Sequence, residues 1–281
     1  MKILLTGARG FTGRHLADLA QREGHEVVLL KGDLCRPQDL EDEIRALNFT
    51  HVVHLAGISF VGNEDDRAFY DVNLFGSLNL LKALSGLDRK PQKIILASSA
   101  NVYGNARVSP ITEDQPPQPT NHYALSKLAM EHMARTFEPD LPILLARIFN
   151  STGPGQSRSF LIPKLIQHYQ ERAPTIELGN LAIEREFNDI RMVARAYLGL
   201  LEKGLSGETY NVCSGIPYRL EFVIETLNRM TGHQPMIRVN PAFVRANEVL
   251  SLCGNPSKME RDLGPSEGYT LEETLGWMLN P

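Results

Sequence analysis

The sequence predicts an α/β fold in which helices cover both faces of a doubly wound, parallel β-sheet. Short apolar runs alternate with longer amphipathic stretches from the first residue onward, which is the pattern of strands joined by crossover helices. The apolar runs lack strict alternation, as expected for strands buried on both faces. A glycine-rich turn directly after the first run marks the place where the first strand meets the first helix.

The elements can be placed in order along the chain. Strands are expected at residues 2–6, 26–30, 51–55, 93–97 and 142–147, and helices at residues 12–23, 37–47, 67–85 and 121–137. After Asn150, glycine and proline cluster in STGPGQS and the elements become shorter. We therefore expect a large domain at 1–150 and a smaller C-terminal α/β lobe at 151–281, with residues 188–212 returning to the large domain. The proline-rich stretch 104–120 is expected to be a lid or a stiffened surface loop.

Composition limits the possible partners. Of the 281 residues, 42% are hydrophobic and 22% charged, as in ordinary globular proteins. The net charge of −4 gives no overall attraction to nucleic acid or to an anionic membrane, and no apolar run is long enough to span a bilayer. The three cysteines lie far apart in the sequence, which predicts no disulfides and favours the reducing cytoplasm. The eight histidines show no ligand spacing, and so no metal site is predicted.

The glycine turn predicts a phosphate-binding site. TGARGFTG places Gly7, Gly10 and Gly13 between the first strand and the first helix. Glycines there allow a tight bend and a close approach of the backbone to a pyrophosphate, while the helix N-terminus supplies free N–H groups. The spacing is GxxGxxG, and a tight connection without a ligand would carry the same glycines. The position in the first βα unit favours a Rossmann-type, dinucleotide-binding fold.

The end of the second strand bears on the choice of cofactor. Dinucleotide folds usually carry an acidic residue there to hold the ribose hydroxyls, whereas this chain has Lys31. Lys31 and Arg9 together would suit a 2′-phosphate, so NADP(H) is favoured over NAD(H), although both could be ordinary surface cations. Asp33 is placed either to accept from the adenine amino group or to cap the next helix.

A candidate reacting group follows from three side chains. Tyr123 and Lys127 lie four residues apart on an expected helix and so share one face. A nearby ammonium is expected to lower the phenol pKa toward its working range. Ser98 and Ser99 end the strand at 93–97, at the sheet edge where ligands of such folds bind. A surface Tyr–Lys contact and serines that only cap a strand are the structural alternatives, but the combination and order of these motifs are far more specific than any one of them.

These motifs resemble the extended short-chain dehydrogenase/reductase family of nucleotide-sugar epimerases, dehydratases and reductases. The resemblance covers nearly the whole chain, through TGARGFTG, GDL at 32–34, HLAG at 54–57, SSANVYG at 98–104, YALSK at 123–127, RIFNSTGPGQ at 147–156, REF at 185–187 and YNVCSG at 210–215. It implies that Ser99, Tyr123 and Lys127 are catalytic. It also implies cofactor contacts from Gly7, Arg9, Gly10, Phe11, Thr12, Gly13, Lys31, Asp33, Leu34, Leu55, Ala56, Gly57, Ala97, Ser98, Tyr123, Lys127 and Phe149. The substrate contacts that it implies come from Ser99, Asn101, Asn150, Arg185, Arg245 and Glu248.

Within the family, GPGQS at 153–157 and GNLAIEREFNDIR at 179–191 are most similar to the GDP-mannose branch and its reductases. The implied activity is the NADPH-dependent reduction of the 4-keto group of a nucleotide-linked 4-keto-6-deoxy sugar, with GDP-4-keto-6-deoxy-D-mannose the best match. Dehydratases of the branch need an ionisable pair after the catalytic hydroxyl, and Ala100 and Asn101 stand there; neither exchanges a proton at neutral pH.

Two other activities stay open. An NAD-dependent nucleotide-sugar 4-epimerase would use the same three catalytic side chains, although Lys31 argues against a tightly held NAD. A non-catalytic dinucleotide sensor would need no intact proton donor. The sequence also departs from the branch at Met192 and Ala246, and it leaves too little room for a usual strand before Asp33. The resemblance further implies a homodimer formed by the helices at 67–85 and 121–137.

Overall fold

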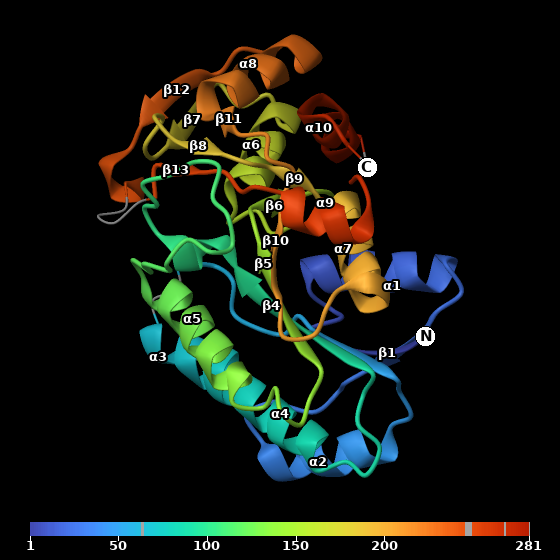
Figure 1. The fold of residues 1–281 in the computed structure, drawn as a ribbon. Helices are drawn as coiled ribbons and strands as arrows, with labels where there is room; N and C mark the ends of the chain where they lie inside the picture. The colour runs from blue at the N-terminus through green and yellow to red at the C-terminus, as the bar shows by residue number, and fades with distance from the viewer. Residues whose placement is uncertain (63–64, 245–248, 267, 281) are drawn as a thin grey trace.

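The central feature is a six-stranded sheet whose strands are all parallel. The computed structural model describes residues 1–62, 65–244, 249–266 and 268–280 (Figure 1). The strand order is β10-β5-β4-β3-β1-β2, and every neighbouring pair is parallel. The strands are β1 (Lys2–Thr6), β2 (Glu26–Leu29), β3 (His51–His54), β4 (Lys93–Ser99), β5 (Ile143–Ile148) and β10 (Thr209–Val212).

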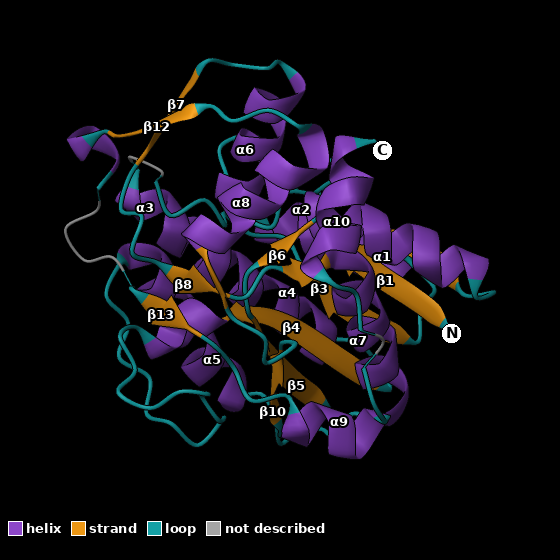
Figure 2. Cartoon of the chain, turned by 90° about the horizontal axis from the view of Figure 1, so that it is seen from above, coloured by secondary structure: helices purple, strands orange, loops and turns teal. Residues whose placement is uncertain are grey.

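Helices cover both faces of this sheet, which confirms the α/β prediction. On one face lie α1 (Phe11–Arg22), α7 (Ile190–Lys203) and α9 (Ser257–Leu263), and on the other α2 (Pro37–Ala46), α4 (Ser77–Ser85) and α5 (His122–Arg135). Successive residues of β1 alternate between the two cores, since Ile3 and Leu5 pack with α1 and α7 while Leu4 packs with α2 and α4. Seen from above, the strands run between the two groups of helices (Figure 2). Burial on both faces explains the continuous apolar runs in the sequence.

The helix expected at 67–85 has an irregular centre. It begins as α3 (Asp66–Phe69), widens into the π-helical segment η1 (Tyr70–Gly76) and continues as α4. Asp65 caps its start by accepting from the Ala68 amide at 3.1 Å. A π-helical turn carries one more residue than an α-turn and commonly occurs at functional sites.

The sheet ends at β2, which has a partner on one side only. From β2 the chain passes through α2 directly to β3 on the far side of β1. Within the described residues, no strand lies between β2 and β3, in keeping with the short connection noted in the sequence. β2 is therefore the edge strand of the sheet on this side, and residues 31–36 follow directly after it.

The second half of the chain builds a smaller lobe with its own core (top of Figure 1). Its short strands pair as β6 (Ser151–Thr152) with β9 (Asn188–Asp189), β7 (Thr175–Leu178) with β12 (Met236–Val239), and β8 (Glu184–Arg185) between β11 (Tyr218–Arg219) and β13 (Ser251–Leu252). Its helices are α6 (Leu161–Gln170), α8 (Leu220–Thr231) and α10 (Leu271–Leu279), and two 3₁₀ turns, η2 (Ala100–Tyr103) and η3 (Pro241–Phe243), complete the elements. Between β9 and β11, the chain returns to the large sheet through α7 and β10.

The loop 104–120 is fixed at its middle. Ile111 is 2% exposed, and its amide and carbonyl pair with the Cys253 carbonyl and the Asn255 amide, each at 2.8 Å. Gly104 has φ +58°, and a Cβ there would lie 1.9 Å from the Gln118 carbonyl oxygen. The loop is thus held against the rest of the protein at its middle, and it is a stiffened surface loop and not a lid.

Two structural absences bear on possible partners. Among the described residues, no helix combines the length and apolarity needed to cross a membrane. The same residues contain no group of three or more His, Cys, Asp or Glu side chains arranged to hold a metal ion.

Candidate active site

The glycine turn is shaped by close backbone contacts. Gly7 has φ +69°, and a Cβ there would lie 2.6 Å from the Ala56 amide nitrogen. A Cβ at Gly13 would lie 2.3 Å from the Gly7 carbonyl oxygen, so α1 packs against the turn itself. Side chains at these two positions would push the first helix away from the sheet, and the glycines are required for this geometry.

The start of α1 is open to an anion. Gly10 is its N-cap and supplies no capping side chain, and the first turn holds no acidic residue. The first amides of a helix have no partner within the helix, and the helix dipole is positive at this end. Arg9, in the turn, is exposed. The arrangement fits the pyrophosphate of a dinucleotide.

A carboxylate that the sequence analysis did not single out lies at the end of β2. Both oxygens of Glu43, on α2, accept from the backbone there, from the Lys31 amide at 2.8 Å and the Gly32 amide at 2.6 Å. Asp33 accepts from the Cys35 amide at 2.9 Å and does not cap α2, whose N-cap is Arg36 and has no side-chain cap bond. The Lys31 side chain is exposed and Leu34 is buried.

Ser99 and Tyr123 come together at the end of β4. Both are buried, at 4% and 7% exposure. Burial raises the pKa of the Tyr123 phenol, and a hydrogen bond with Ser99 acts in the opposite direction. Asn101, at the start of η2, donates to Ser99 Oγ from its amide and from Nδ2, each at 3.2 Å. The three polar groups therefore form one cluster.

Lys127 lies one helical turn after Tyr123 and is also buried. Its Nζ donates to the Ala97 carbonyl at 2.8 Å and would lie 3.3 Å from a Cβ on Gly57. Burial lowers the pKa of Lys127 to about 8, with Glu131 acting against it. The expectation that Lys127 lowers the phenol pKa is not met, because burial of Tyr123 dominates in the opposite direction.

Asn73 links the segment after β3 to α5, a contact that no sequence motif indicated. Its Oδ1 accepts from the Ile58 amide at 2.8 Å, and its Nδ2 donates to the Ile58 carbonyl at 3.1 Å and to Ser126 Oγ at 3.0 Å. Ser126 in turn donates to the Tyr123 carbonyl at 2.8 Å. The π-helical segment η1 carries Asn73, and so it holds the first turn of α5 against the site.

A buried polar network lies behind the cluster. Ser98 Oγ donates to Glu131 at 2.5 Å, and Arg147 Nε and Nη2 donate to the same carboxylate at 2.9 and 2.7 Å. Arg147 also donates to the Tyr103 hydroxyl at 2.9 Å. Ser98 and Arg147 are cross-strand partners, and the network ties the ends of β4 and β5 to α5.

The structure describes some of the residues that the resemblance implies for substrate binding, but not all of them. The Asn150 carbonyl accepts from the Asn188 amide and Nδ2, at 2.9 and 3.1 Å. Arg185, in β8, is half-buried and donates to the Glu184 carbonyl at 2.9 Å. Arg245 and Glu248 lie outside the described residues, as does Ala246.

Phe149 points into a buried cluster. It is 1% exposed, and its ring centroid lies 6.3 Å from that of Tyr103. A Cβ on Gly254 would lie 2.6 Å from the Phe149 ring. Any contact of Phe149 with a cofactor would therefore come from its backbone.

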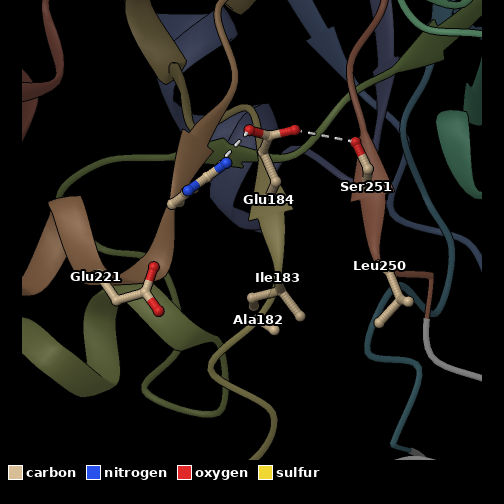
Figure 3. A pocket seen from close by; sticks show the side chains of 7 residues that line it. Ala182, Ile183, Glu184, Glu221, Leu250 and Ser251 are labelled. Atoms are coloured by element: carbon tan, nitrogen blue, oxygen red, sulfur yellow. Dashed lines mark hydrogen bonds and ion pairs between the residues drawn. The ribbon is translucent and has the colours of Figure 1, made fainter.

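A cavity of about 360 Å³ opens in the smaller lobe (Figure 3) and is lined by Ala182, Ile183, Glu184, Arg219, Glu221, Leu250 and Ser251. Glu184 is held there by Ser251 Oγ at 3.3 Å and Arg219 at 3.9 Å. Arg185, the next residue along β8, is not among the residues that line this cavity.

Comparison with known proteins gives a consistent family. The family model described as GDP-mannose 4,6 dehydratase matches residues 23–278. The chain is 33% identical to a GDP-6-deoxy-D-talose 4-dehydrogenase of Aggregatibacter actinomycetemcomitans, over 96% of this chain and 94% of the relative. It is 32% identical to a GDP-6-deoxy-D-mannose reductase of Pseudomonas aeruginosa, over 99% and 96%.

Solved structures agree along the full length. A protein of Burkholderia cenocepacia J2315, provisionally described as an epimerase, superposes with a TM-score of 0.93 at 41% identity, covering 99% of this chain and 97% of that one. The protein RMD of P. aeruginosa, solved with NADPH, gives 0.89 at 31% identity over the same shares. The chain therefore belongs to the GDP-mannose 4,6-dehydratase family and is an NAD(P)-dependent oxidoreductase of the extended short-chain dehydrogenase/reductase type.

Proposed function

We propose that this enzyme uses NADPH to reduce the 4-keto group of a GDP-linked 4-keto-6-deoxy sugar, with GDP-4-keto-6-deoxy-D-mannose as the best candidate. The proposal rests mainly on one observation: Ser99 and Tyr123 are buried and hydrogen-bonded to each other at the end of β4, and the buried side chain of Lys127 lies one helical turn after Tyr123. Support comes from two relatives whose names describe redox chemistry on GDP-6-deoxy sugars.

The side chains fit a reduction. A bound nicotinamide supplies the hydride that becomes attached to C4 of the sugar. Ser99 Oγ would hold the carbonyl oxygen by a hydrogen bond, and Tyr123 Oη would give that oxygen its proton as the C=O bond becomes a C–O single bond. Lys127 would orient the ribose and help to return a proton to the phenolate. Since burial raises the Tyr123 pKa, the phenol is protonated at neutral pH, which is the form that reduction needs.

The two positions after Ser99 carry no ionisable side chain that could transfer the proton in an elimination. Ala100 and Asn101 open the 3₁₀ turn η2, and neither an apolar methyl group nor a carboxamide transfers protons at neutral pH. Asn101 instead donates to Ser99. This supports a reductase within a family whose model carries a dehydratase description.

The preference for NADP(H) rests on two exposed cations. Lys31 lies just after β2 and Arg9 in the glycine turn, where they would meet a 2′-phosphate. The P. aeruginosa structure at 31% identity was solved with NADPH, which supports the same cofactor here.

An NAD-dependent nucleotide-sugar 4-epimerase is the second candidate, favoured by the provisional description of the 41% identical B. cenocepacia protein. An epimerase retains its cofactor and consumes none, so net oxidation of NADPH separates the two activities. A non-catalytic sensor would bind cofactor, and Tyr123→Phe would leave any background turnover unchanged.

The test is incubation of the purified protein with NADPH and either GDP-4-keto-6-deoxymannose or a dTDP-linked 4-keto-6-deoxy sugar. We expect one NADPH to be oxidised per GDP-sugar consumed, with a 4-hydroxyl product seen by NMR. Preference for the dTDP-sugar would refute the GDP assignment. Interconversion of 4-hydroxy sugars without NADPH oxidation would establish the epimerase.

We also propose a homodimer formed through η1 and α5. These segments pack on each other and expose Phe75 and Leu125, at 51% and 42%. Sedimentation at micromolar concentration should show a dimer that Leu125→Glu dissociates, whereas Leu205→Glu, on an exposed leucine outside these segments, should leave it intact. A wild-type monomer would refute the proposal.

A further inference from the structure

We propose that Glu43 determines cofactor specificity by holding a carboxylate at the end of β2, where it disfavours the 2′-phosphate of NADP(H). The inference rests on the proposed binding of a dinucleotide at the glycine turn, and it is independent of the sugar substrate. Glu43 would lower the ratio of NADP(H) affinity to NAD(H) affinity, which Lys31 and Arg9 would raise.

The position of Glu43 is built into the fold. Leu40 and Ile44 are fully buried and fix α2 against the sheet, which brings Glu43 to the end of β2. There its two oxygens accept from the Lys31 and Gly32 amides at 2.8 and 2.6 Å. A carboxylate accepting two amides in this way is held in one orientation.

The same close approach leaves no room for a side chain at position 32. A Cβ at position 32 would lie 2.6 Å from Glu43 Oε2. Any other residue there would force the carboxylate to move. The backbone and the side chain therefore fit each other only while residue 32 is glycine.

The chemistry follows from what dinucleotide folds do at this place. An acidic residue after the second strand accepts hydrogen bonds from the ribose hydroxyls and repels a 2′-phosphate. This chain has Lys31 at the usual position, but the carboxylate arrives from α2. It also uses up the two amides that could otherwise donate to a phosphate.

Within the described residues Glu43 forms no ion pair, and the neighbouring Asp33 is a second carboxylate. Asp33 is held by the Cys35 amide at 2.9 Å and by Arg36 at 3.9 Å. Lys31 donates to Glu43 through its backbone, which leaves its exposed ammonium free to turn to a ligand. A 2′-phosphate would thus meet two cations, Lys31 and Arg9, and the fixed carboxylate of Glu43, while Arg36 partly offsets the charge of Asp33.

The experiment compares dissociation constants for NADP⁺ and NAD⁺ by isothermal titration calorimetry, without substrate. In Glu43→Gln, the ratio of NADP⁺ to NAD⁺ affinity should rise about tenfold over the wild type, and the rise should shrink at high salt because the effect is between charges near the surface. Glu41→Gln is the matched control, since Glu41 lies on the same helix and pairs with Arg45 at 3.6 Å; its ratio should stay within twofold of the wild type.

A second variant tests the same proposal should Glu43→Gln fail to fold. Gly32→Ala displaces the carboxylate while keeping its charge, and it should move the ratio in the same direction. Equal weakening of both cofactors in Glu43→Gln, or a ratio that moves toward NAD⁺, would overturn the proposal by showing that Glu43 only stabilises β2. A wild type that prefers NAD⁺ but shifts toward NADP⁺ in Glu43→Gln would support Glu43 while refuting the proposed NADPH preference.

Discussion

Replacement of Lys127 by methionine should stabilise the cofactor-free protein while removing its activity. The pKa of Lys127 falls from 10.5 to about 8 because the ammonium is buried, and a pKa difference of this size corresponds to roughly 3 kcal/mol against folding at neutral pH. Methionine removes that cost but leaves the Ala97 carbonyl without its donor at 2.8 Å, which costs about 1–3 kcal/mol. The net gain should be on the order of 1 kcal/mol.

The gain should depend on pH in a defined direction. Below pH 8 the lysine is protonated in both the folded and unfolded wild type, so the full cost applies. Between about pH 8 and 10.5 the folded state loses its proton first, and the wild type becomes more stable relative to the variant. Above that range the cost is gone, and the wild type should be the more stable of the two because it keeps the contact with Ala97.

Urea unfolding of both proteins at several pH values from 7 to 10.5 measures this difference, because the other groups titrate alike in both. Lys82→Met, on the exposed face of α4, is the control and should give a small difference that does not vary with pH. A Lys127→Met protein whose stability relative to the wild type is the same at every pH would show that the buried ammonium carries no such cost.

Three further predictions concern neighbouring residues. Tyr123→Phe should lower kcat by about 10²–10⁴-fold with the dissociation constant for NADP⁺ unchanged, and a loss below tenfold would remove Tyr123 as the proton donor. Gly13→Ala should weaken NADP⁺ binding more than tenfold in calorimetry, since the added Cβ would lie 2.3 Å from a backbone oxygen; Gly268→Ala, with nothing within 4 Å, is its control. Glu131→Gln should reduce the free energy of unfolding in urea by about 3–5 kcal/mol because it leaves Arg147 buried without its carboxylate, whereas Glu138→Gln, in a surface pair, should cost less than about 1 kcal/mol.

The features predicted correctly from sequence depend on local rules. Strand positions follow from apolar runs, and the helices at 11–22 and 37–46 begin and end within one residue of expectation because their flanking glycine and proline act locally. The fold class follows from the alternation of these elements. The order of motifs also places Ser99 and Tyr123 at one edge, and the structure brings them together.

The features that sequence did not reveal depend on contacts between distant elements. Glu43 reaches the end of β2 from a helix, and nothing near Lys31 in the sequence signals that a carboxylate will arrive there. Asn73 enters the site through a π-helical turn, whose extra residue has no reliable sequence signature. The direction of the Tyr123 pKa was missed because spacing gives the neighbouring charge but not the burial.

Arg147 and Lys127 are both buried cations, but in the described part of the chain only Arg147 has a carboxylate partner. Arg147 has its carboxylate partner, Glu131, at 2.7 Å, and hydrogen bonds and charge attraction from Glu131 outweigh burial and raise its pKa. Lys127 donates only to a backbone carbonyl, and within the described residues no carboxylate forms an ion pair with it. Burial therefore decides the direction of its shift and lowers the pKa to about 8, and the more distant charge of Glu131 only partly opposes this. A ligand whose oxygen atoms accept hydrogen bonds from this ammonium would stabilise its charged form, so we expect the burial that weakens the empty fold to strengthen the binding of the proposed cofactor.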